Sequence, residues 1–130
     1  MAERIAPKKY WNARKDAIYE AIKEEVHNNP ESALAFLDTM FDFIYDSCAR
    51  VENNKIEVYV RSEYGYREFD TVEELFNNSP YNIEDIAVHL SLNQKNHFHF
   101  HKDAIPKSVL AAMRKYAITE KAIKKWQENR

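Results

Sequence analysis

The chain has 130 residues, of which 45% are hydrophobic and 31% are charged, and its formal net charge is −2. This is the size and composition of one ordinary soluble domain, and no apolar run approaches the ~18 residues of a membrane span. The single glycine, Gly65, excludes phosphate loops, dinucleotide fingerprints and nucleophile elbows, each of which needs several glycines. The single cysteine, Cys48, excludes an internal disulfide and, together with the lack of a signal peptide, indicates a cytoplasmic protein.

The small net charge conceals a strong asymmetry along the chain. Residues 31–85 carry thirteen acidic and four basic side chains, whereas residues 86–130 carry nine basic and three acidic ones. An asymmetry of this size predicts electrostatic steering toward a charged partner. The alternative is that the acidic and basic parts neutralise one another by facing each other in the fold.

Two helices are expected in the first part of the chain. Apolar residues recur every three or four positions within 8–27, which predicts a first amphipathic helix. Asn29 as the N-cap, Pro30 at the first helical position and Glu31 in the first turn predict the start of a second helix. Its apolar run is wide and extends to Val51, so we expect this to be the central and most buried helix.

An acidic ridge is expected on that second helix. Asp38, Asp42 and Asp46 are spaced four residues apart and therefore share one helix face. Such a ridge is usually just the solvated face of a helix. The functional interpretation is an anionic docking surface that imitates phosphate charge and so binds, and inhibits, a protein that handles nucleic acids.

A β-hairpin is expected at residues 55–70, because apolar and polar residues alternate on both sides of a turn at 62–65. Gly65 is expected to supply any positive φ that the turn requires. The strands would carry a tyrosine–arginine patch made of Tyr59, Arg61, Tyr66 and Arg67. Tyrosine and arginine are common at binding surfaces, although they are also ordinary strand residues.

A short helix follows from Val72 to about Asn78, with Asp70 or Thr71 as its cap and Glu73 or Glu74 completing a capping box. Residues 83–92 then fit either a helix or a strand. We favour the strand, because the histidine-rich segment 97–101 alternates strictly and needs a neighbour with which to pair.

Four of the five histidines lie in this second predicted hairpin: His89, His97, His99 and His101. Residues four apart on a strand are separated by ~13 Å, so a shared ion would combine His99 with His89 across the ladder and with only one of the other two. Such a set would suit zinc or another divalent metal in a small metal-dependent enzyme. The simpler interpretation is a half-exposed sheet face that needs no cofactor.

A basic helical segment is expected from about residue 106 to 129, either continuous or divided by a new cap at Thr119. Its cations are candidates for binding nucleic-acid phosphates, and they are Lys107, Arg114, Lys115, Lys121, Lys124 and Lys125.

The sequence thus predicts a single α+β domain in the order α-α-β-β-α-β-β-α, with a mostly antiparallel sheet packed on the first, second and last helices. No catalytic motif is present, so we favour a regulatory protein that binds a protein partner through its charged surface. Nucleic-acid binding and metal-dependent catalysis are the alternatives. No membrane partner is expected, and the sequence leaves the oligomeric state open.

Overall fold

The computed structural model describes residues 8–92, 105–116 and 120–128. The elements in chain order are α1 (Lys8–Asn28), α2 (Pro30–Tyr45), β1 (Ala49–Glu52), β2 (Lys55–Val60), the short 3₁₀ helix η2 (Arg61–Glu63), β3 (Gly65–Phe69), α3 (Val72–Asn78), α4 (Ile83–Leu92), α5 (Lys107–Lys115) and α6 (Glu120–Glu128). The strands form one antiparallel sheet in the order β1-β2-β3. The predicted α+β class, with an antiparallel sheet packed on helices, is confirmed.

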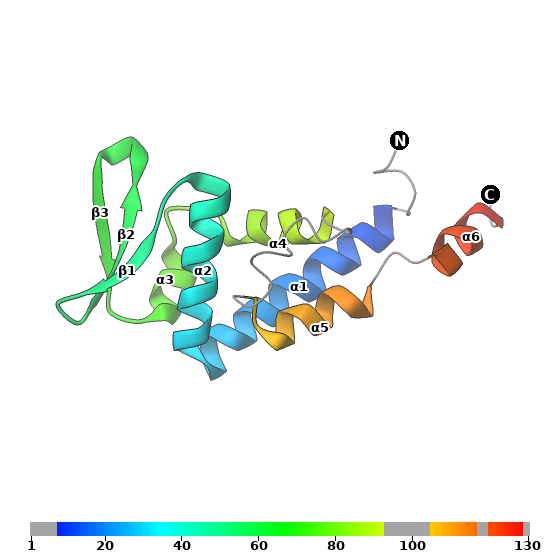
Figure 1. Ribbon diagram of the computed structural model, residues 1–130, viewed down its shortest axis with the longest axis horizontal. Coiled ribbons are helices and arrows are strands. Elements are labelled where there is room, and N and C mark those ends of the chain that lie inside the picture. Colours follow the sequence, from blue (N-terminus) through cyan, green and yellow to red (C-terminus); the bar gives the residue numbers. More distant parts are fainter. Residues whose placement is uncertain (1–7, 93–104, 117–119, 129–130) are drawn as a thin grey trace.

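The sheet lies at one end of the molecule, and the helices cover only one of its faces (Figure 1). Helices α2 and α3 lie directly against the sheet, whereas α1, α4 and α5 form the part of the molecule behind them. Helix α6 lies at the opposite end from the sheet (Figure 1). The sequence predicted packing of the sheet on the first, second and last helices. The main helical contacts are with α2, as predicted, and with α3 in place of the first and last helices.

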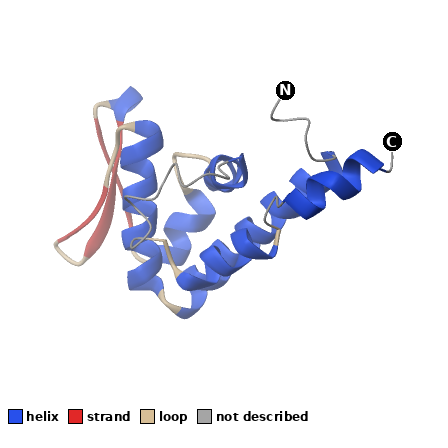
Figure 2. Ribbon diagram, turned by 45° about the vertical axis from the view of Figure 1, so that its right-hand side comes forward, coloured by secondary structure: helices blue, strands red, loops and turns tan. Residues whose placement is uncertain are grey.

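Buried apolar side chains from the sheet, from α2 and α3, and from the helices behind them form one core cluster. Its fully buried members include Ile18 and Ile22 of α1, Phe36 and Phe41 of α2, Val58 of β2, Leu75 of α3, Ile86 of α4 and Val109 of α5. Helix α2 supplies more large buried side chains than any other described element, as its wide apolar arc predicted. Figure 2 shows this helix standing between the sheet and the other helices.

The second helix ends earlier than its apolar run. The sequence predicted a helix over residues 30–50, but α2 ends at Tyr45, and Asp46 adopts the left-handed conformation at φ 52°. The N–H of Asp46 donates to Asp42 O, and the N–H of Ser47 donates to Phe41 O. These two bonds satisfy carbonyls at the helix end, so the chain leaves the helix without losing backbone hydrogen bonds.

The residues after that helix end form β1, a strand that the sequence interpretation did not include. Asn53 and Asn54 both have positive φ, at 53° and 63°, and they join β1 to β2 as a two-residue turn. Two-residue hairpins favour this conformation because its twist matches that of the flanking strands, and asparagine tolerates it well.

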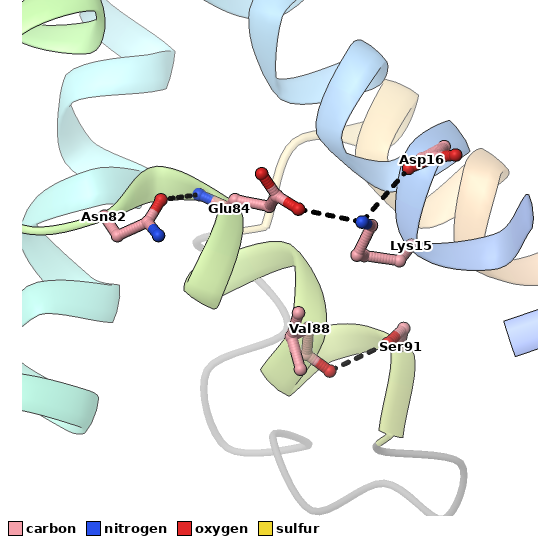
Figure 3. A network of polar contacts seen from close by, with 6 residues as sticks. All are labelled: Lys15, Asp16, Asn82, Glu84, Val88 and Ser91. Carbon is pink, nitrogen blue, oxygen red and sulfur yellow. Dashed lines mark hydrogen bonds and ion pairs between the residues drawn. The ribbon is translucent and has the colours of Figure 1, made fainter. Parts of the chain in front are cut away.

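Residues 83–92 form helix α4, and the predicted strand at this position is wrong. Asn82 caps the helix, since its Oδ1 accepts the N–H of Glu84 at 2.9 Å (Figure 3). The helical spacing buries Ile83, Ile86, Ala87 and Leu90 on one face. A strand would have buried only every second residue, so the helix removes more apolar surface from water here. The partner strand predicted at 97–101 lies outside the described residues.

The start of α3 follows its sequence signals, whereas Asn29 occupies the N-cap position of α2 without a side-chain hydrogen bond. Thr71 caps α3, with its Oγ1 accepting the N–H of Glu74 at 3.0 Å. The carboxylate of Glu74 in turn accepts the N–H of Asp70 at 3.0 Å, which completes a variant of the predicted capping box. The basic C-terminal segment is divided, because α5 ends at Lys115 and α6 begins at Glu120. None of the helices in the described part of the chain combines the length and the apolarity that a membrane crossing requires.

Candidate docking surface on the acidic lobe

We define the acidic lobe as α2, the three-stranded sheet and α3, residues 30–78. It contains eleven carboxylates and four basic side chains, a formal charge of −7. Nine of the eleven carboxylate residues are exposed, the exceptions being the partly buried Asp38 and Glu57. The elements that carry this charge, α2, the sheet and α3, lie together at one end of the molecule (Figure 1).

Each basic side chain of the lobe is paired within the lobe. Arg50 pairs with Glu57 at 3.2 Å, Arg67 with Glu63 at 2.5 Å, Arg61 with Asp46 at 3.9 Å, and Lys55 with Asp70. Among the described residues, no ion pair joins the lobe to a cation of another element. The lobe thus keeps seven carboxylates beyond its internal pairs, and within the described residues none of them forms an ion pair with a cation of the basic C-terminal part.

The outer sheet face, which the helices leave uncovered, carries an aromatic cluster. The strand register sets Tyr59 opposite Tyr66, and their ring centroids are 5.2 Å apart in an edge-on arrangement. The guanidinium of Arg50 lies 4.2 Å from the centroid of Tyr66 while it pairs with Glu57. A cation above an aromatic face is attracted by the ring, so Arg50 of β1 is linked both to Glu57 of β2 and to Tyr66 of β3.

This cluster only partly matches the predicted tyrosine–arginine patch. Tyr59 and Tyr66 meet as expected, but Arg61 lies in η2 near Asp46, and Arg67 points to the other face of the sheet, toward Glu63. Arg50 takes their place on the outer sheet face. The sequence interpretation missed it because β1 was assigned to the preceding helix, although the Asn-Asn pair that follows β1 was the available signal.

The turn before β3 also differs from expectation. Gly65 does not have positive φ; Tyr64 does, at φ 53°, and it is 88% exposed. Its N–H closes the turn by donating to Arg61 O at 3.2 Å. A bulky residue in the left-handed region stores backbone strain, so Tyr64 is both strained and accessible to a partner.

The three aspartates of the predicted acidic ridge have different surroundings. Asp38 is partly buried, and its Oδ1 accepts the N–H of Ala49 at 2.9 Å, which ties α2 to β1. Asp46 lies beyond the helix end and faces Arg61. Asp42 is exposed on the helix. They do not form a row of three equivalent carboxylates, so any docking function belongs to the lobe as a whole.

The helical body, which we define as α1, α4 and α5, is organised by one buried cation. Arg14 of α1 is 3% exposed, and its guanidinium donates to Ser91 O at 2.8 Å, Met113 O at 2.5 Å and Tyr116 O at 2.9 Å. These acceptors lie at the C-terminal ends of α4 and α5, where the helix dipole favours a cation. Burial lowers the pKa of Arg14, but a guanidinium stays protonated in proteins.

A second polar contact fixes the other end of the α1–α5 pair. Glu25 of α1 is 9% exposed, and its carboxylate accepts the hydroxyl of Ser108 at 2.7 Å. On the side of α4, Lys15 pairs with Glu84 at 2.8 Å and with Asp16 at 3.3 Å (Figure 3). Polar contacts therefore join α1 to α4, and α1 to α5, near both ends of α4 and of α5.

A tyrosine pair connects the acidic lobe to the helical body. The rings of Tyr45 and Tyr81 stack with centroids 4.4 Å apart, and the Tyr81 hydroxyl donates to Tyr59 O at 3.2 Å. Burial, followed by the charge of Asp85, raises the pKa of Tyr45 to about 12. A hollow of about 200 Å³ lies beside this connection, with Tyr19, Tyr81 and Glu84 in its lining. It is smaller than the pockets that usually hold organic ligands.

The predicted nucleic-acid residues are all exposed, on α5 for Lys107, Arg114 and Lys115, and on α6 for Lys121, Lys124 and Lys125. None of them forms an ion pair within the described parts of the chain. Because α5 and α6 are separate helices, the six cations do not share one continuous helix face.

Only one of the four histidines of the predicted metal site, His89, lies within the described residues. His89 is an exposed residue of α4, so it cannot face His99 across a strand ladder. His97, His99 and His101 lie outside the described residues. Within residues 8–92, 105–116 and 120–128, no group of three potential metal ligands comes together.

Comparison with protein-family models, with curated proteins and with solved structures found no match to this chain.

Proposed function

We propose that this chain is a binding protein that docks on a basic surface of a protein partner through its acidic lobe. The observation that carries the proposal is the pairing pattern: the four cations of the lobe are paired internally, and seven carboxylates remain. Surface charges of one sign repel one another, so these unpaired carboxylates do not stabilise the folded lobe. Its clearest benefit is attraction of an oppositely charged surface.

The partner would be a protein with a basic, phosphate-binding surface, and occupation of that surface would exclude nucleic acid from it. This makes the chain a regulatory accessory protein, acting in the cytoplasm, where its single cysteine stays reduced. Support for the phosphate-imitating role comes from the whole lobe, since only Asp42 of the three aspartates is a fully exposed residue of α2.

Affinity capture with charge-reversed variants tests the proposal. The first variant combines Asp42→Lys with Glu52→Lys, two exposed residues of the lobe with no ion pair among the described residues. The matched control combines Glu20→Lys with Glu24→Lys, exposed residues of α1 that give the same change in net charge. Captured proteins are quantified at two salt concentrations, after circular dichroism has confirmed that both variants are folded.

Proteins that bind the unmodified chain and the α1 control, but are lost from the lobe variant and at high salt, are the expected result. Equal capture by both variants would overturn the docking role of the lobe.

The opposite end of the molecule supports a second candidate function. Six exposed cations on α5 and α6 have no ion-pair partner among the described residues, and local positive charge governs binding to phosphates. Titration of a labelled oligonucleotide at increasing salt checks this candidate against a Lys121→Glu, Lys125→Glu variant. A steep salt dependence that the variant reduces is expected, and absence of binding at low salt would exclude it.

A further inference from the structure

We infer that the free edge of β3 receives an extended, basic segment of the partner protein as an added strand. The inference rests on the proposed function, because it names the kind of segment that the acidic lobe binds. It depends on three features of this edge: its hydrogen-bonding groups, its aromatic side chains and its charge.

The hydrogen-bonding groups follow from the ladder pattern. Tyr59 N–H donates to Cys48 O at 3.1 Å, so the backbone of Tyr59 faces β1. Since antiparallel ladders alternate, Val58 and Val60 face β3, where they are opposite Arg67 and Gly65. Tyr66 lies between Gly65 and Arg67, and Glu68 follows Arg67. These two residues must then direct their N–H and C=O groups away from β2. No described strand pairs with them on that side.

The two edges of the sheet are not equivalent. On β1 the same alternation directs Ala49 and Val51 outward, but the N–H of Ala49 is already bound by the carboxylate of Asp38. On β3 the carboxylate of Glu74 binds the N–H of Asp70, one position beyond the strand. Within the described residues, Tyr66 and Glu68 at the edge of β3 both have an unbound N–H and C=O, whereas at the edge of β1 only Val51 has both. The edge of β3 is therefore the better template for an added strand.

Aromatic side chains stand at the entry to this edge. Tyr64 is 88% exposed and has positive φ, and Tyr66 is 41% exposed on the outer sheet face. Neither the strain nor the exposure of Tyr64 serves the packing of the chain itself. Exposed tyrosines beside free backbone groups provide apolar contact for an incoming strand.

The charge of the edge decides what kind of strand it accepts. Glu68 lies on the outer sheet face, opposite Glu57, and forms no ion pair among the described residues. A lysine or arginine on the same face of an added strand would neutralise it. A second copy of this chain is a poorer occupant. Pairing two copies through β3 would bring together two lobes that each carry a formal charge of −7, and the registers centred on Arg67 or on Glu68 would also set like charges directly opposite each other.

Nuclear magnetic resonance titration with synthetic peptides tests this inference on the full chain. The probe is a short capped peptide of alternating lysine and valine. One comparison peptide has the same sequence with backbone N-methyl groups on its lysines, which keeps the charge but removes the donors that would face Tyr66 and Glu68. The other has alternating glutamate and valine, which reverses the charge. We expect the lysine–valine peptide alone to shift the amide signals of Tyr66 and Glu68.

Two protein variants locate the binding. Glu68→Lys should lower the affinity for the lysine–valine peptide about tenfold, because an attractive charge becomes a repulsive one. The matched control Glu73→Lys, an exposed residue of α3 with the same charge change, should alter the affinity less than about twofold because solvent and salt screen it. Tyr64→Gly should weaken binding while it keeps the fold, since glycine accepts the same backbone conformation.

Equal binding of the N-methylated peptide, or signal changes confined to residues outside β3, would overturn the edge as the docking site. If that happens while the Asp42→Lys, Glu52→Lys variant still loses its captured partners, the acidic-lobe function stands without this edge. If neither effect is observed, both proposals fall.

Discussion

The helical body and the acidic lobe use charged side chains in opposite ways. In the body, Arg14 and Glu25 are buried, and each is hydrogen-bonded to groups on other helices. In the lobe, the charged side chains are mostly exposed, and their ion pairs lie on the surface. Removing the partner of a buried polar group lowers the free energy of unfolding strongly, whereas an exposed ion pair contributes little to it. The body should therefore be sensitive to polar substitutions, while the lobe should tolerate them and leave its charge available for binding.

The largest effect is expected from Arg14→Met. This change leaves the carbonyls of Ser91, Met113 and Tyr116 without their buried donor. The free energy of unfolding should fall by about 3 kcal/mol, because each buried carbonyl that stays unsatisfied costs ~1 kcal/mol or more. Urea denaturation measures the loss.

Two controls separate the hydrogen bonds from the charge. Arg14→Lys keeps the charge but lacks the planar fork, so it should recover only part of the lost stability. Lys15→Met removes an exposed ion pair one residue along α1 and should cost less than ~1 kcal/mol. Equal losses for Arg14→Met and Lys15→Met would remove the contrast between the two regions.

A smaller effect is expected within the lobe, at Asp38, the aspartate of the acidic ridge whose carboxylate accepts a backbone N–H. Asp38→Ala removes the acceptor of the Ala49 N–H and should lower the free energy of unfolding by about 1 kcal/mol. Asp42→Ala, one helical turn further and exposed, should stay within ~0.5 kcal/mol of the unmodified chain. Thermal unfolding of the pair provides the measurement, and a larger loss for Asp42→Ala would contradict this assignment of roles.

A gain in stability is expected at the tip of the second hairpin. Tyr64→Gly removes the strain of a bulky residue at φ 53°, so the free energy of unfolding should rise by about 0.5–1 kcal/mol. Gly65→Ala is the matched control. The φ of Gly65 is not positive, and the nearest heavy atom to an added Cβ is 3.8 Å away, so this change should be close to neutral. A loss of stability in Tyr64→Gly would mean that the tyrosine side chain contributes to folding.

The smallest effect concerns the connection between the two regions and is visible only at high pH. The pKa of Tyr45 is raised to about 12 from an ordinary value near 10. The unfolded chain therefore loses this proton first. The contribution of the protonated Tyr45 hydroxyl to the free energy of unfolding is complete below pH ~10, and it is lost as the pH rises through about 12. Tyr45→Phe should flatten the decline of the melting temperature over this interval, and an unchanged decline would place the cause elsewhere.

Sequence reasoning found the elements that carry strong local signals. The helical period of the first helix, the Asn29–Pro30 start of α2, the Thr71 cap and the alternation of β2 are all present in the structure. It failed where a short apolar stretch was compatible with two structures. Residues 83–92 fit both periods, and the cap at Asn82 decided for the helix.

The details of the candidate site depended on long-range geometry that no local pattern contains. The position of Arg50 over Tyr66 requires the order and register of three strands, and the sequence interpretation had only two. Arg14 looked like one more polar residue of an amphipathic helix. Its acceptors are backbone carbonyls that belong to helices elsewhere in the chain, so its burial could not be predicted from the spacing of side chains.

The contacts of Arg14 also bear on the order in which the chain acquires its structure during synthesis. Its acceptors are 77, 99 and 102 residues further along the sequence. A chain made from its N-terminus has formed α1, α2 and the whole sheet before the last of these carbonyls exists. The acidic lobe can thus assemble early, from contacts between neighbouring segments, whereas the first helix made must wait for Tyr116 before its buried cation is satisfied.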